Sequence, residues 1–273
     1  MRKILSLLGA MILTTTTSAN IIACGGGEEP KEKNKTEIIN LGSTIYGLAF
    51  KSDDLYISTQ NKNINKINTI QIKPTKTEII NLGSTANSLV FKINDLYVAT
   101  WDTRIYKVDT TKIIPTKTEI INLGTTANSI AFNGNDLYVG TQDNKIYKID
   151  ITQIIPTKTE IINLGTTANS IAFNGNDLYV GTQDNKIYKI DITKPNPHKI
   201  FISNLNSQPH SLAFNGNNLY VGTQDSKIYK INIIRTSNKT DVINLGSIAH
   251  SLVFKGNILY FGTQDSKIYK IDF

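Results

Sequence analysis

The chain of 273 residues has few of the residue types on which several protein classes depend. Its single cysteine excludes an internal disulfide, a CxxC redox pair and a cysteine-based zinc site. Seven prolines and eighteen glycines are too few for a collagen-like or low-complexity chain. Catalysis of the Ser-His-Asp type needs a positioned histidine, and the chain offers only His198, His210 and His250. No phosphate-binding glycine motif is present.

Long hydrophobic runs are also scarce. One run of ten residues, Ile4 to Leu13, follows the basic start Met1-Arg2-Lys3, and it is too short to cross a hydrocarbon layer of ~30 Å. A polar stretch then leads to Ile21-Ile22-Ala23-Cys24. This leader resembles the signal peptide and lipobox of a bacterial lipoprotein, in which cleavage follows the small Ala23 and the thiol of Cys24 takes a diacylglyceryl group.

The resemblance implies a domain organisation and a location. Residues 1–23 would be the signal peptide, 24–35 the lipidated cysteine and a flexible linker, and 36–273 the folded body. Two acyl chains give a stable anchor, so the protein is expected on the outer side of the cell membrane. With its Asn-, Ile- and Lys-rich composition, the leader is similar to surface lipoproteins of wall-less bacteria of the mollicute or spiroplasma type. The alternative is an ordinary secretory signal with an incidental cysteine.

Positive charge is present but spread along the chain. The formal net charge is +7, and loss of Arg2 and Lys3 with the signal leaves +5. The lysines recur at equivalent positions about 41 residues apart rather than in one cluster. A distributed charge argues against a nucleic-acid-binding stripe, so we expect no nucleic-acid partner.

Internal repetition is the strongest signal in the sequence. The motif Leu-Tyr-Val-Gly-Thr-Gln-Asp and its variants recur at spacings of 41, 41, 41, 41 and 40 residues, with their tyrosines at Tyr56, Tyr97, Tyr138, Tyr179, Tyr220 and Tyr260. Residues Ile113 to Thr152 are identical to Ile154 to Thr193. Neighbouring units should therefore share one local structure.

Each unit contains four short β-type segments. In the third unit they are Ser129–Phe132, Leu137–Thr141, Lys145–Asp150 and Thr159–Leu164, with a turn at Asn133-Gly134-Asn135. Asn-Gly turns between β-branched runs favour hairpins. Four short strands per ~40 residues are typical of a β-propeller blade. The sequence predicts an all-β, six-bladed β-propeller of four-stranded blades.

The ends of the chain predict how the ring closes. The outer-strand segment occurs six times, beginning with Thr36 to Leu41, yet the chain ends at Phe273 directly after a third strand. We therefore expect the N-terminal segment to complete the last blade, one strand pairing with three C-terminal ones, which leaves no long exposed edge.

The motif Asp136-Leu-Tyr-Val-Gly-Thr-Gln-Asp143, followed by Ile146-Tyr-Lys-Ile-Asp150, resembles the PQQ-like propeller repeat. The resemblance implies the fold and not a cofactor. Quinoprotein enzymes of that family carry a tryptophan in most blades, whereas Trp101 is the only one here. We therefore expect no cofactor.

A candidate site follows from positions at which the repeats differ. The residue before each predicted inner strand reads Tyr46, Asn87, Asn128, Asn169, His210 and His250, and the first residue of each turn between the second and third strands reads Gln60, Trp101, Gln142, Gln183, Gln224 and Gln264. Both sets should rim one mouth of the central channel. The exceptions to Asn and Gln belong to blades five, six, one and two, which are consecutive in a closed ring.

We interpret this rim as a binding site and expect no catalytic or metal-binding residue. Tyrosine and tryptophan favour protein contacts and stacking on sugar rings. The predicted ligand-binding residues are Tyr46, Trp101, His210, His250, Asn87, Asn128, Asn169, Gln142 and Gln183. The alternative for the four exceptions is drift in terminal repeats. A weaker alternative is a metal or pH-responsive site at His210 and His250 with Asp225 and Asp265.

The sequence thus favours a non-enzymatic, membrane-anchored binding module with a protein or glycan ligand at the channel mouth. The resemblance to mollicute surface lipoproteins implies an adhesin-like role. One alternative is a scaffold that organises other membrane proteins. A metal-dependent hydrolase or lactonase is a further alternative, but the positions that begin the inner strands lack carboxylates. The sequence carries no indication of the oligomeric state.

Overall fold

The computed structural model describes residues 34–234 and 239–273, which fold entirely as β-strands and their connections. The predicted signal peptide, the predicted lipidation site Cys24 and all but the last two residues of the linker lie outside the described residues. Blades one to three contain β2 (Ile45–Lys51), β3 (Asp54–Thr59), β4 (Asn63–Asn68), β5 (Thr77–Asn81), β6 (Ala86–Lys92), β7 (Asp95–Thr100), β8 (Arg104–Asp109), β9 (Lys117–Asn122), β10 (Ala127–Asn133), β11 (Asp136–Thr141), β12 (Lys145–Asp150) and β13 (Lys158–Asn163). Blades four to six contain β14 (Ala168–Asn174), β15 (Asp177–Thr182), β16 (Lys186–Asp191), β17 (Lys199–Asn204), β18 (Pro209–Asn215), β19 (Asn218–Thr223), β20 (Lys227–Asn232), β21 (Lys239–Asn244), β22 (Ala249–Lys255), β23 (Ile258–Thr263), β24 (Lys267–Asp272) and the N-terminal β1 (Thr36–Asn40).

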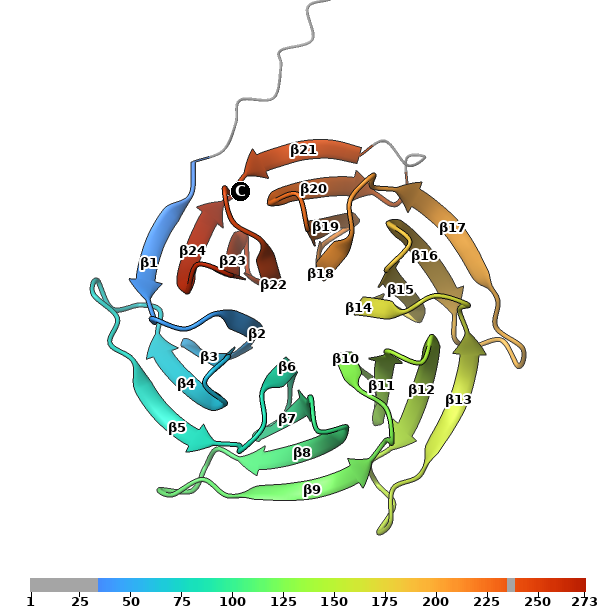
Figure 1. Ribbon diagram of the computed structural model, residues 1–273, viewed down its shortest axis with the longest axis horizontal. Coiled ribbons are helices and arrows are strands. Elements are labelled where there is room, and N and C mark those ends of the chain that lie inside the picture. The colour runs from blue at the N-terminus through green and yellow to red at the C-terminus, as the bar shows by residue number, and fades with distance from the viewer. Residues whose placement is uncertain (1–33, 235–238) are drawn as a thin grey trace, which may run out of the picture. The chain divides into compact units, whose positions relative to one another are not determined.

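The strands form six antiparallel sheets of four, arranged around a central axis with β2, β6, β10, β14, β18 and β22 innermost (Figure 1). Five sheets consist of consecutive strands, and the sixth has the order β1-β24-β23-β22. In that sheet Thr36 pairs with Lys270 and Asn40 pairs with Lys267. The predicted six-bladed propeller, closed by one N-terminal strand, is confirmed.

The burial of each strand explains its composition. In β11 every residue after Asp136 is buried, because both faces of this second strand pack against neighbouring blades. In β12 buried and half-buried residues alternate at several positions. The outer strand β13 begins with three exposed residues, as expected at the rim of the ring.

Packing between blades repeats around the ring. The ring of Tyr138 meets Phe173 of the next blade edge to face, with centroids 5.0 Å apart, and five further blade boundaries have the same Tyr–Phe pair at 4.9 or 5.0 Å. A Cβ atom added to Gly140 would lie 3.0 Å from the Cβ of Ala168, so the glycine allows the close approach of two sheets.

Hydrogen bonds also cross the blade boundaries. The Ser129 hydroxyl accepts a bond from the backbone N–H of Ile171 in the next blade, at 3.1 Å. The Lys158 ammonium donates to the carbonyl oxygen of Leu123 and lies 4.4 Å from the centre of the Tyr147 ring. Each blade is therefore held by its neighbour through both apolar and polar contacts.

Strand ends differ slightly from the prediction. The turn comprises only Gly134 and Asn135, because Asn133 already pairs with Asp136. The outer strand ends at Asn163, since the N–H of the buried Leu164 turns to the carbonyl of Asn144 at 2.7 Å. The described part of the chain contains no helix with the length and apolar character to cross a membrane.

Candidate ligand-binding site at the channel mouth

Antiparallel pairing places two sets of connections at the same end of the ring. The turn between the second and third strands of a blade meets the segment that leads into its own inner strand. The backbone N–H of Trp101 donates to the carbonyl of Thr85 at 2.9 Å, and that of Gln142 donates to the carbonyl of Thr126 at 3.0 Å. We call this end the mouth.

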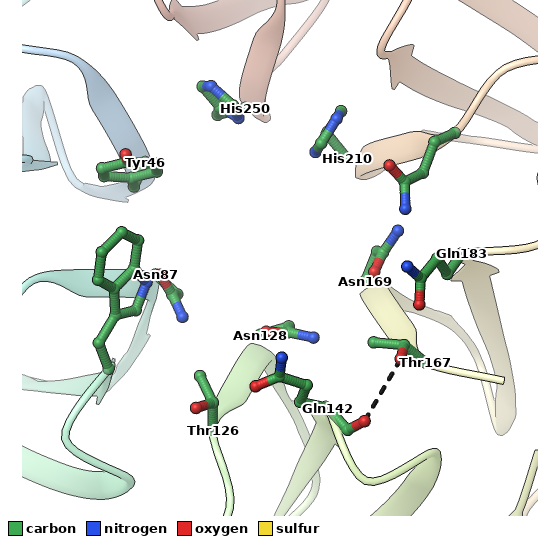
Figure 2. A pocket seen from close by; sticks show the side chains of 12 residues that line it. Tyr46, Asn87, Thr126, Asn128, Gln142, Thr167, Asn169, Gln183, His210 and His250 are labelled. Atoms are coloured by element: carbon green, nitrogen blue, oxygen red, sulfur yellow. Dashed lines mark hydrogen bonds between the residues drawn. The ribbon is translucent and has the colours of Figure 1, made fainter.

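A cavity of about 550 Å³ opens at the mouth, a size within the ~300–1,000 Å³ range of small-molecule sites. Figure 2 shows side chains from all six blades converging on it. Its lining comprises Tyr46, Asn87, Trp101, Thr126, Asn128, Gln142, Thr167, Asn169, Gln183, Gln208, His210 and His250. The structure thus brings all nine sequence-predicted binding residues together around one cavity.

The asparagines are fixed by the neighbouring blade. The side-chain amides of Asn87, Asn128 and Asn169 donate to the carbonyl oxygens of Ala127, Ala168 and Pro209 at 3.1, 3.0 and 3.2 Å. These bonds use amide N–H groups. Each carboxamide oxygen retains acceptor capacity next to the cavity.

Four aromatic and imidazole rings form a continuous series along the other side of the cavity. The ring centroids are 5.7 Å apart for Trp101 and Tyr46, 5.3 Å for Tyr46 and His250, and 5.2 Å for His250 and His210. We call these four residues the aromatic arc. Their contacts cross three blade boundaries, which matches the sequence expectation that the four exceptions lie in consecutive blades.

The two ends of the arc are oriented by hydrogen bonds. The indole Nε1 of Trp101 donates to Oδ1 of Asn87, and the indole is 50% exposed. The imidazole Nε2 of His210 bonds to Oε1 of Gln224, and an amide oxygen only accepts, so His210 is the donor.

The arc is uncharged at neutral pH. Burial, followed by the nearby His210, lowers the pKa of His250 to about 4. Burial also lowers the pKa of His210, against the opposing effect of its bond to Gln224, and burial raises the pKa of the Tyr46 hydroxyl. Since the other lining residues are carboxamides, threonines and an indole, the cavity presents neutral donors, neutral acceptors and aromatic faces.

Of the two carboxylates considered with the histidines, Asp225 serves its own turn instead, and neither Asp225 nor Asp265 lines the cavity. Asp225 accepts hydrogen bonds from the hydroxyl of Thr223 and, at 2.8 Å, from that of Tyr229. Asp143 has the equivalent bond from Tyr147, also at 2.8 Å. Within residues 34–234 and 239–273, no three His, Cys, Asp or Glu side chains group as metal ligands. The geometry gives the metal-site alternative no carboxylate at the cavity.

Three lining residues were missed from the sequence. Thr126, Thr167 and Gln208 each lie two positions before an inner-strand residue of the cavity. The same repeat position could have identified them, because it belongs to the same connection. Conversely, Gln60, Gln224 and Gln264 occupy the turn position of Gln142 but are not lining residues.

A narrower space of about 110 Å³ continues along the axis below the cavity. The six residues predicted to precede the inner strands are instead the second residues of those strands, because each strand begins two residues earlier than predicted, at Ala127 rather than Ser129 in the third blade. These six residues line both spaces, and the lower one adds serines such as Ser129 and aliphatic residues such as Ile171. Since Ser129 binds Ile171 across a blade boundary, the lower space belongs to the packing of the ring.

Comparisons with known proteins identify the fold but no family. No protein-family model matches the chain, and no curated protein matches it. Among solved structures, the β-propeller domain of Cps50 (Swd1) from Myceliophteria thermophila is similar, with a TM-score of 0.61, 12% identity and coverage of 84% of this chain and 83% of that one. The computationally designed Ika8 protein is similar with a TM-score of 0.55 and 19% identity, over 84% of this chain and 71% of that one.

Proposed function

We propose that the protein is a membrane-anchored, extracellular binding module without enzymatic activity, adhesin-like, whose cavity at the mouth takes an uncharged polar ligand such as a glycan. The observation that carries the proposal is the aromatic arc facing carboxamides of the same cavity. Aromatic faces pack against the C–H faces of sugar rings, and carboxamides offer both donors and acceptors to hydroxyl groups.

The electrostatics of the cavity favour a neutral ligand. Its lining has no carboxylate, lysine or arginine among the described residues, and both histidines are neutral at pH 7. A charged ligand would therefore lose hydration without gaining an opposite charge. A peptide that presents polar backbone and hydroxyl groups remains the other ligand class with matching chemistry.

The absence of catalysis is part of the same proposal. The hydroxyl of Thr167 in the cavity donates to the backbone carbonyl of Gln142 at 3.3 Å. That of Ser129 in the lower space bonds across a blade boundary, and His210 is bonded to Gln224 rather than to a nucleophile. A general base needs a nucleophile within hydrogen-bond reach. The arrangement supports recognition better than acyl or glycosyl transfer.

The location rests on the leader sequence. Ile21-Ile22-Ala23-Cys24 supports lipidation at Cys24, and a diacylglyceryl group would hold the propeller at the outer surface of the membrane. The resemblance of the repeats to PQQ-like blades supports the packing of the ring and adds no cofactor to the proposal.

The experiment uses the single tryptophan. Because Trp101 is the only tryptophan and lines the cavity, its fluorescence reports directly on the site. Neutral oligosaccharides of varied composition would be titrated into the protein, and hits repeated with acidic oligosaccharides. We expect a saturable change in emission with neutral ligands and a weaker response with acidic ones.

A variant restored to the repeat consensus provides the control. It carries Tyr46→Asn, His210→Asn and His250→Asn, with Trp101 retained as reporter. We expect at least a tenfold loss of affinity, since stacking contacts contribute about 0.5–1.5 kcal/mol each. Equal affinity would refute the role of the arc, and capture of one membrane protein by both forms would favour the scaffold alternative.

A further inference from the structure

The end of the ring opposite the mouth, which we call the far end, exposes isoleucines in successive blades. They lie in the loops between third and fourth strands, such as those joining β8 to β9 and β12 to β13, which project from the outer edge of the ring (Figure 1). Ile72 is 98% exposed, and Ile113 and Ile154 are completely exposed. The adjacent Ile114 and Ile155 are also exposed.

These isoleucines are not the uncovered edge of a core. Each hydrophobic cluster of the ring consists of strand residues and their close neighbours, and none contains Ile72, Ile113 or Ile154. Single exposed apolar residues are ordinary, but here the same exposed isoleucine recurs in the equivalent loop of three blades, so that one flat surface can contact all of them. The half-buried Pro115 and Pro156 follow the two isoleucine pairs and restrict the backbone that presents them.

The chain enters the ring at this same end. Strand β1 starts at Thr36, which pairs with Lys270 near the end of β24, and it ends at Asn40, which pairs with Lys267 beside the mouth-side turn. Residues 34 and 35 therefore approach from the far end. The eleven residues between Cys24 and Thr36 reach at most ~40 Å when fully extended.

The charge of the far end complements an anionic surface. The loops between the third and fourth strands of blades one to four (69–76, 110–116, 151–157 and 192–198) contain no acidic residue, and those of blades one, two and four contain lysine. Aspartates end the preceding strands of blades two to four, and Asp109 and Asp191 lie 3.9 and 3.8 Å from Lys112 and Lys194. The exposed Lys73 and Lys76 follow Ile72 in sequence, and Lys112 and Lys194 lie in the equivalent loops of blades two and four. Lysine beside exposed isoleucine is the pattern of an interfacial membrane contact.

We propose that the far end docks onto an anionic lipid bilayer, with its loop isoleucines in the headgroup region and the mouth turned away from the membrane. The proposal does not depend on the ligand of the cavity. It makes the propeller a membrane-oriented body and not one that tumbles freely on a tether, so that the cavity always points outward. The lipid contact also explains why the isoleucine loops and the start of β1 share one end.

Vesicle flotation tests the proposal with the chain from residue 24 onward, carrying Cys24→Ser so that no acyl chain contributes. Every strand of the closed ring lies within this chain, and circular dichroism with a thermal melt verifies folding. The vesicles contain phosphatidylcholine with about one third phosphatidylglycerol, against pure phosphatidylcholine. We expect binding to the anionic vesicles that decreases with added salt.

Blade four supplies the matched variant. Its loop has Pro195-Asn196 where blades two and three have isoleucine pairs, so the same fold already accepts the polar sequence. The variant carries Ile113→Pro, Ile114→Asn, Ile154→Pro and Ile155→Asn. We expect at least a tenfold lower partition coefficient, because the variant lacks the favourable free energy of moving about four isoleucine side chains from water into the bilayer.

A second variant separates this proposal from the function of the cavity. Trp101→Gln with Tyr46→Asn should reduce glycan binding and leave vesicle binding unchanged. Failure of the unaltered chain to bind anionic vesicles would overturn the proposal, as would binding that the polar loops do not reduce. A concentration-dependent dimer that the polar loops abolish, without vesicle binding, would instead identify the far end as a contact between two copies.

Discussion

Replacing His250 by asparagine should remove a measurable part of the acid sensitivity of the fold. His250 is half-buried at the mouth, between Tyr46 and His210. Its pKa is lowered to about 4, first by burial and then by His210. Because the folded pKa is depressed, the unfolded chain takes up this proton more readily. The stabilising effect of neutral His250 is complete above pH ~6.5 and is lost as the pH falls toward 4.

The magnitude follows from the two pKa values. A pKa of about 4 in place of the ordinary 6.5 corresponds to about 3 kcal/mol at ~1.4 kcal/mol per pKa unit. At pH ~4.5 most of this difference is realised, about 2 kcal/mol, while at pH ~7 almost none is. Between pH ~7 and pH ~4.5 the free energy of unfolding of the wild-type protein should therefore fall by about 2 kcal/mol more than that of His250→Asn.

The comparison isolates one titration from the others. Burial raises the pKa of the Asp225 carboxyl, but hydrogen bonds from Thr223 and Tyr229 hold it below its usual value. Such carboxylates also destabilise the fold in acid, yet they do so in both proteins and cancel in the difference. Asparagine does not titrate, and Asn128 shows that the position accepts it.

The assay is urea unfolding at pH ~7 and pH ~4.5, followed by circular dichroism, with the free energy of unfolding extrapolated to water. The quantity compared is the change in free energy between the two pH values. If wild type and His250→Asn lose the same free energy within about 0.5 kcal/mol, the imidazole is not desolvated at the mouth. The neutral state of the cavity at pH ~7 would then rest on the ordinary histidine pKa of ~6.5 alone.

Two further predictions concern the ring. Ile93 has a backbone φ of +56° and is 84% exposed. This left-handed conformation costs a β-branched residue about 1–2 kcal/mol. Ile93→Gly should therefore raise the free energy of unfolding by about 1 kcal/mol. The reciprocal Gly134→Ile should lower it by a similar amount, and unchanged urea midpoints would contradict this account. A chain that starts at residue 42 should melt at a clearly lower temperature than one that starts at residue 36, because only the latter contains β1; equal melting temperatures would refute closure by β1.

The sequence sufficed for the fold because every blade repeats the same local signals. The motif around Tyr138 marks a strand buried on both faces, the Asn-Gly turn marks a hairpin, and the missing last outer strand requires β1. Such signals are local, and six copies of them leave little choice of topology. Antiparallel pairing then placed the predicted rim residues at one end.

The parts that could not be predicted depend on contacts between distant residues. Nothing in the sequence shows that the Asp225 carboxylate accepts a hydrogen bond from the Tyr229 hydroxyl. This bond holds the carboxylate in its turn, and Asp225 does not line the cavity. Nor does it show that Ile113 is exposed, since an apolar pair next to a strand is ordinarily expected in the core. The lining role of Thr126 depends on how the crossing segment meets Gln142, which is a tertiary contact.

One departure from the repeat consensus inside the ring is a compensated pair. Blade three pairs Ser129 with Gly140, whereas blade one pairs Gly47 with Ser58 at the same register. A Cβ atom on Gly47 would lie 2.7 Å from the hydroxyl of Ser58. The two small residues have exchanged strands, so the change at one position required the change at the other.

The aromatic arc is a different kind of departure. Tyr46, His210 and His250 lack the carboxamide with which Asn128 bonds the next blade, and each such bond contributes about 1 kcal/mol. Packing does not require the replacement of asparagine by tyrosine or histidine, because blades three and four bond to the next blade through asparagine at this position. The altered side chains contact one another across three boundaries. Drift in the terminal repeats would also place them side by side, because the first and last repeats adjoin in the closed ring, so ligand binding by the consensus variant distinguishes the two explanations. The consensus variant should therefore be at least as stable as the wild type, and a loss of ligand binding in it would reflect the loss of the arc itself.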